Sequence, residues 1–74
     1  MGKRSLTIAG HRTSISLEEP FWEALAEIAA ERKASMAAVV AGIDGARQGR
    51  GNLSAAVRIY VLEWYRRKAA PDAR

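Results

Sequence analysis

Two short alternations of apolar and polar residues open the chain, and they constrain its fold more than any other feature. Leu6 and Ile8 are apolar members of the first alternation, and Ile15 and Leu17 are those of the second. A period of two predicts β-strands. Because the apolar positions are even-numbered in the first stretch and odd-numbered in the second, one continuous strand would place them on opposite faces. Gly10 lies between the stretches, where a bulge or a turn can reset the register. The segment is therefore interpreted as a broken strand, or as an arm followed by a strand.

After residue 17 the apolar residues recur with helical spacing in three stretches. Pro20 suits the first turn of the first helix, Ser35 is suited to the N-cap of the second, and Asn52 or Ser54 caps the third. We expect a single domain over 1–74: an N-terminal arm (1–11), a strand (12–17), helices at 18–33, 35–46 and 52–68, a glycine-rich basic linker (47–51) and a tail (69–74).

The chain is short and lacks any covalent cross-link. It has 74 residues and no cysteine, and its only histidine is His11, so neither disulfides nor a structural zinc site is expected. A chain of this size buries only about 60% of its unfolded surface, which favours a partner subunit. The third helix is apolar over more than one face, because Ile59 and Leu62 lie off its main stripe. The residues expected in the core of a dimer are Ile15, Leu17, Leu25, Ile28, Val39, Val40, Ile43, Val57, Val61 and Trp64.

Charge is separated along the sequence. The net charge is +4, residues 1–17 contain no acid, and residues 18–31 contain five glutamates and no base. A basic surface favours a polyanionic partner. Charges interrupt every apolar stretch, and no secretory signal is recognisable, so we expect a soluble cytoplasmic protein and no membrane contact. No nucleophile–base pair and no phosphate-binding loop is present, so we expect no catalytic residue, no metal and no cofactor.

The order of the predicted elements resembles a known superfamily. The segments RTSISL (12–17), EEPFWEAL (18–25) and ASMAAVV (34–40) are similar to the strand, first helix and second helix of the ribbon-helix-helix superfamily of bacterial repressors and antitoxins. The opening KRSLTIAGHRTS (3–14) resembles a subfamily of small bacterial members. The resemblance covers about residues 3–64, and the third helix is an addition to the minimal family core. It implies a mostly helical homodimer in which the strands of two subunits pair into an antiparallel ribbon.

The resemblance also implies a transcriptional regulator that binds double-stranded DNA with its ribbon in the major groove. If Thr13, Ile15 and Leu17 face the helices, the base-reading side chains are those that alternate with them: Arg12, Ser14 and Ser16. Arg12 can bond a guanine through two hydrogen bonds, which are worth about 1–3 kcal/mol of discrimination.

In the family, the N-terminus of the second helix anchors a DNA phosphate. Ser35 and the backbone N–H of Met36 match that position. The candidate phosphate contacts are Ser35, Met36, Lys33, Lys3 and Arg4. The segment LSAAVR (53–58) fits the same family position as well. In that register, Ser54 is the anchor and residues 34–51 are an insertion.

A second function is open: a protein–protein interaction module that keeps the fold without reading DNA. The small outward side chains Ser14 and Ser16, the acidic first helix and the apolar third helix favour it. Trp22 lies one position from the first helix's stripe, so we expect it to be partly exposed at a partner surface. Assembly beyond a dimer is left open as well.

Overall fold

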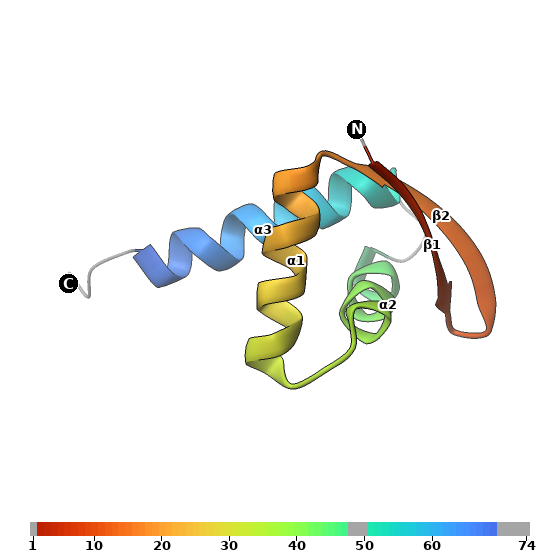
Figure 1. Cartoon of the computed structure of the whole chain (residues 1–74), viewed down its shortest axis with the longest axis horizontal. Coiled ribbons are helices and arrows are strands. Elements are labelled where there is room, and N and C mark those ends of the chain that lie inside the picture. The colour runs from red at the N-terminus through yellow and green to blue at the C-terminus, as the bar shows by residue number, and fades with distance from the viewer. Residues whose placement is uncertain (1, 48–50, 70–74) are drawn as a thin grey trace.

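The computed structural model describes residues 2–47 and 51–69, which form a β-hairpin followed by three helices (Figure 1). The elements are β1 (Gly2–Ile8), β2 (His11–Leu17), α1 (Glu19–Arg32), α2 (Met36–Arg47) and α3 (Leu53–Ala69). The mostly helical fold with three helices is as predicted. Residues 48–50 of the expected linker and residues 70–74 of the expected tail lie outside the described residues.

The hairpin differs from the ribbon that we expected. β2 pairs in antiparallel fashion with β1 of the same chain, from Gly2 opposite Leu17 to Ile8 opposite His11, so the ribbon is intrachain rather than intersubunit. Residues 2–8 are accordingly a strand and not an arm. The connecting residues Ala9 and Gly10 have φ angles of 51° and 84°. Two consecutive positive φ angles form the tight turn whose twist matches that of a hairpin.

This turn explains the change of parity in the sequence. In the observed register an even-numbered residue of β1 stands opposite an odd-numbered residue of β2, as Leu6 does with Thr13. Both apolar sets therefore lie on one face of the hairpin, and Ile8, Ile15 and Leu17 are buried there.

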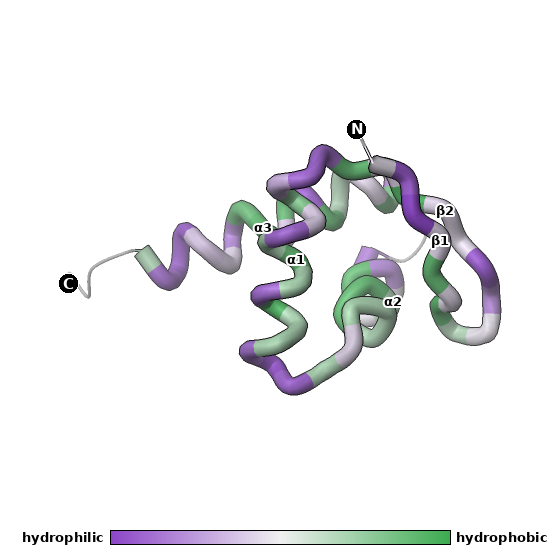
Figure 2. Tube along the Cα trace, in the orientation of Figure 1, coloured by the Kyte–Doolittle hydropathy of each residue, from purple (hydrophilic) through white to green (hydrophobic). Residues whose placement is uncertain are grey.

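One chain builds its own hydrophobic core. The side chains buried in it come from both strands and all three helices: Ile8, Ile15, Leu17, Trp22, Leu25, Ile28, Ala29, Val39, Val40, Ile43, Val57 and Val61. Every residue expected in a dimer core except the half-buried Trp64 is among them. Their place in an interface between subunits stays a prediction. Figure 2 shows α2 as largely hydrophobic, whereas the end of α1 that leads into it is hydrophilic.

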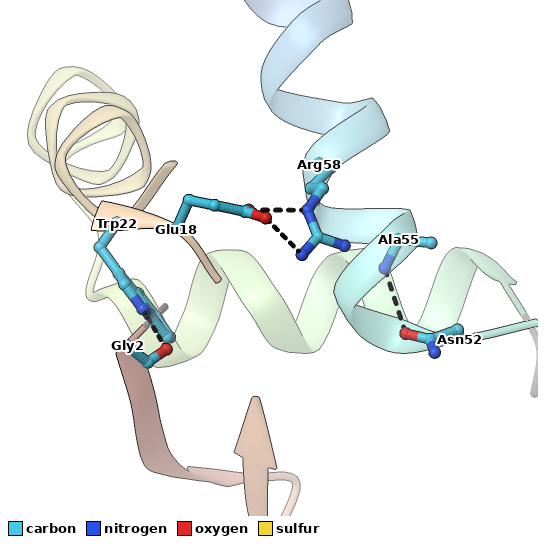
Figure 3. A network of polar contacts seen from close by, with 6 residues as sticks. All are labelled: Gly2, Glu18, Trp22, Asn52, Ala55 and Arg58. Atoms are coloured by element: carbon cyan, nitrogen blue, oxygen red, sulfur yellow. Dashed lines mark hydrogen bonds and ion pairs between the residues drawn. The ribbon is translucent and has the colours of Figure 1, made fainter. Parts of the chain in front are cut away.

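Trp22 fastens the hairpin to α1. Its side chain is 1% exposed, which corrects the expectation of partial exposure. The indole N–H donates a hydrogen bond to the Gly2 carbonyl oxygen at 2.9 Å (Figure 3). The guanidinium carbon of Arg4 lies 4.7 Å from the centre of the indole ring. A Cβ built on residue 2 lies 2.5 Å from Glu19 Oε2, so the Glu19 side chain would have to shift to accommodate any larger residue there. The hairpin covers Trp22. The spacing of apolar residues within α1 cannot predict this burial, because the covering residues belong to another element.

Polar contacts tie α3 to α1 along its length. Near its start, Arg58 donates two hydrogen bonds to the Glu18 carboxylate, at 2.9 and 3.2 Å. Further on, the Tyr65 hydroxyl donates to Glu27 at 2.8 Å, and this hydrogen bond raises the pKa of Tyr65 to about 12. Lys68 forms an ion pair with Glu31. The acidic row of α1 is thus partly neutralised by α3.

Candidate nucleic-acid interface

The face of the hairpin that points away from the core is polar. Side chains alternate between the two faces of a strand, and the register places three side chains of each strand on this outer side. These six residues, called the ribbon face below, are Lys3, Ser5, Thr7, Arg12, Ser14 and Ser16. Five of them are exposed and Ser16 is half-buried. Neither strand contains an acidic residue.

The ribbon face carries a cation near each end. Lys3 stands opposite Ser16 at the open end of the hairpin, and Arg12 stands opposite Thr7 next to the turn. Lys3 and Thr7 are four positions apart along β1, which corresponds to about 14 Å at the usual rise of a strand. Between them Ser5 and Ser14 lie opposite each other, with their hydroxyl oxygens 3.4 Å apart.

The structure brings the three predicted base-reading residues onto the ribbon face, and it adds Lys3, which was predicted as a phosphate contact. Ser5 and Thr7 were not predicted. The signal that identifies them is in the sequence: a two-residue turn at Ala9 and Gly10 places odd-numbered residues of the first strand on the outer side.

Arg4, predicted at a phosphate, lies on the other side of β1. Besides covering the Trp22 ring, its guanidinium approaches Glu19 Oε1 at 3.8 Å. Its side chain is about half exposed. These contacts give Arg4 a part in holding the hairpin on α1, and its role at a phosphate stays a prediction.

Three other predicted residues meet at the corner between α1 and α2. Lys33 ends α1 in the left-handed conformation, with φ 55° and ψ 45°. Ser35 caps α2, since its hydroxyl accepts the Ala38 N–H at 3.0 Å, and Met36 begins that helix. This corner lies at the end of α1 remote from the hairpin strand that precedes the helix (Figure 1). The ribbon face and the corner are separate places on the surface.

The start of α3, the alternative phosphate position, lies beside the end of β2. Asn52 caps this helix by accepting the Ala55 N–H at 3.2 Å, so Ser54 lies within the first turn (Figure 3). One turn later, Arg58 bonds Glu18, the residue that directly follows β2. The same hydrogen bonds hold the pKa of the Glu18 carboxyl below its ordinary value.

Neither a metal site nor a membrane-spanning helix is found among residues 2–47 and 51–69. No three His, Cys, Asp or Glu side chains in these ranges are grouped so that they hold a metal ion. No helix within them has the length and hydropathy needed to cross a bilayer.

The fold and the ribbon face define a small domain in which helices support a polar two-stranded ribbon. The chain belongs to the ribbon-helix-helix family: the profile of the ribbon-helix-helix domain matches residues 1–65. This is a family of DNA-binding regulators and antitoxins whose members are typically non-catalytic. The predicted resemblance is thereby confirmed. Comparison with curated proteins and with solved structures finds no match.

Proposed function

We propose that the protein is a transcriptional regulator that binds double-stranded DNA as a homodimer, with the ribbon face in the major groove. The observation that carries this proposal is the ribbon face itself, which is polar, free of acids and cationic near both ends. A two-stranded ribbon has the width of the major groove, and ribbon readers are an established way of docking on DNA.

The chemistry of the ribbon face suits the reading of base edges. Arg12 donates a fork of hydrogen bonds that matches O6 and N7 of guanine. Ser14 and Ser16 both donate and accept, so they tolerate several bases and make recognition sequence-specific or semi-specific. Lys3 extends this set as a flexible donor at the other end of the ribbon.

Phosphate anchoring has two candidate positions. Ser35, as an observed N-cap next to Lys33, favours the start of α2. The contact between Arg58 and Glu18, which joins α3 to the end of β2, favours Ser54 at the start of α3.

Aspartate variants distinguish the two positions. Ser35→Asp keeps an N-capping side chain, and Ser54→Asp adds a favourable charge to a first helical turn, so both helices stay stable. A carboxylate at the true anchor repels the phosphate. Duplex affinity is therefore expected to fall for only one of the two variants, whichever residue is the anchor.

A fluorescence-anisotropy titration with labelled duplex tests the function. We expect binding at low salt and a steep loss of affinity as salt rises, because phosphate contacts release counterions. Arg12→Ala is expected to weaken binding to preferred duplexes, while Arg66→Ala, which changes an exposed cation on α3, serves as the control. Absence of duplex binding at low salt contradicts the proposal. A protein partner that is retained after nuclease treatment then favours the interaction module.

A further inference from the structure

We propose that the hairpin of a single chain reads DNA as a quasi-symmetric unit, in which β1 repeats the reading set of β2 and Lys3 selects a base as Arg12 does. The inference deepens the proposed function and rests on it, because it specifies the kind of DNA sequence that the ribbon face fits. A ribbon of two identical strands carries the same side chains in both halves. Here one chain supplies both strands, and the two halves are similar without being identical.

The starting observation is a short repeat in the sequence. Residues 3–8 are KRSLTI and residues 12–17 are RTSISL, so both segments have a basic residue, a serine, an aliphatic residue, a hydroxyl residue and a second aliphatic residue at the same places. Burial of one face explains the matching aliphatic residues, since each strand of such a hairpin needs them. Burial does not explain why the outward residues match too. The one place that differs holds Arg4 and Thr13, both on the side opposite the ribbon face.

The strand register turns this repeat into a two-fold relation on the ribbon face. Ser5 stands opposite Ser14, and their hydroxyl oxygens lie 3.4 Å apart. A half-turn about the centre of this pair exchanges the two antiparallel strands. It brings each outward residue of β1 onto an outward residue of β2 with the same kind of side chain: Lys3 onto Arg12, Ser5 onto Ser14 and Thr7 onto Ser16. The ribbon of one chain therefore approximates the symmetric ribbon that two identical strands form.

The contacts of its two chain neighbours hold Lys3 in place. The Gly2 carbonyl oxygen accepts the Trp22 indole N–H at 2.9 Å, and the guanidinium of Arg4 lies over the same ring. Lys3 itself is exposed. Its backbone is thus attached to α1 on both sides while its side chain is free to meet a ligand. A side chain on such a supported strand occupies a defined position, which selection of a particular base requires.

The two ends of the ribbon face differ in how strictly they select a base. Arg12 has a planar guanidinium that donates two fixed hydrogen bonds to O6 and N7 of guanine. Lys3 donates to the same atoms through an ammonium on a flexible stem, so it discriminates less. The length of about 14 Å between the two ends corresponds to about four base-pair steps. The preferred site is therefore a quasi-palindrome: a strictly selected guanine at one end, and a less strictly selected guanine about four base pairs away on the other DNA strand.

Selection of duplexes from a randomised pool, followed by sequencing, tests this layout. Arg12→Ala is expected to reduce the preference for guanine by on the order of 10-fold at one end of the site only. Lys3→Ala is expected to remove the weaker preference at the other end, and Lys3→Arg to strengthen it, so that the two ends become alike. Arg66→Ala, at an exposed cation on α3, is the control and leaves the selected sequence unchanged. An Arg12→Ala variant that alters both ends equally, or Lys3 variants that alter neither end, overturns the inference.

A cross-linking experiment tests the pairing of the strands without DNA. The chain contains no cysteine, so a double variant with Ser5→Cys and Ser14→Cys has only two thiols, at positions whose side chains meet across the ribbon. Mild oxidation is expected to link them within one chain, which then migrates as a single chain on a non-reducing denaturing gel. A covalent dimer, or no cross-link, overturns the inference.

Failure of this inference and failure of the proposed function give different results. If the wild type binds no duplex at low salt, the proposed function is contradicted, and the inference that rests on it is overturned as well. If the wild type binds and selects duplexes whose two ends respond alike to Arg12→Ala, the inference alone is overturned, and the ribbon face remains a DNA-binding surface.

Discussion

At the scale of single residues, two tryptophans differ in one hydrogen bond. The Trp22 N–H bonds the Gly2 carbonyl, whereas the buried Trp64 N–H has no hydrogen-bond partner among the described residues. Trp22→Phe leaves the Gly2 carbonyl without its donor and loosens the hairpin. We therefore expect it to lower the free energy of unfolding by about 1 kcal/mol more than Trp64→Phe does. Urea unfolding followed by circular dichroism measures both, and an equal effect in the two variants contradicts a fastening role for Trp22.

The ion pair between Glu18 and Arg58 gives stability a pH dependence. The Arg58 hydrogen bonds lower the pKa of Glu18 from 4.5 in the folded state, so the folded chain binds this proton less readily than the unfolded one. The resulting stabilisation is present above pH 4.5 and disappears as the pH falls through the lower folded-state pKa. The stability difference between wild type and Glu18→Gln is therefore expected to shrink over that window. Urea midpoints at several pH values test this. Glu23→Gln, at an exposed site, is the control.

At the scale of elements, two glycines are expected to respond oppositely to the same change. Gly10 has a φ of +84° in the hairpin turn. Gly10→Ala therefore strains the backbone and lowers the free energy of unfolding by about 1 kcal/mol. Gly45 lies inside α2, and a Cβ there meets open space. Gly45→Ala is therefore expected to raise the free energy of unfolding by about 0.5–1 kcal/mol. Thermal unfolding of both variants provides the comparison, and a stabilised Gly10→Ala contradicts the turn geometry.

The elements also show what sequence patterns predict. The helical spacing of apolar residues and the capping residues predicted α1, α2 and α3, because a helix that buries one face needs an apolar residue every three or four positions within its own segment. The change of parity across Gly10 located the break between the strands. The change of parity did not identify β1 as the strand that pairs with β2, and we expected the pairing strand to come from a second subunit, because an unpaired edge is satisfied equally well by either chain. For that reason the position of Ser5 and Thr7 on the ribbon face was not predicted. Trp22 was misjudged because the hairpin that covers it comes from outside its own helix.

At the scale of the whole molecule, two cations have different roles in the proposed DNA complex: one contacts a base and the other contacts a phosphate. Arg12 is on the ribbon face and Lys33 is at the corner between α1 and α2. We expect Arg12→Ala to relax base preference by about 1–3 kcal/mol at one position while the salt dependence of binding stays unchanged. We expect Lys33→Ala to weaken binding to all duplexes alike, and to reduce the slope of log K against log salt by about 0.9 for each DNA phosphate that is no longer neutralised. Anisotropy titrations of two duplex sequences at several salt concentrations measure both quantities. If Lys33→Ala leaves the slope unchanged, the phosphates are held elsewhere, and the start of α3 beside β2 becomes the anchor to test.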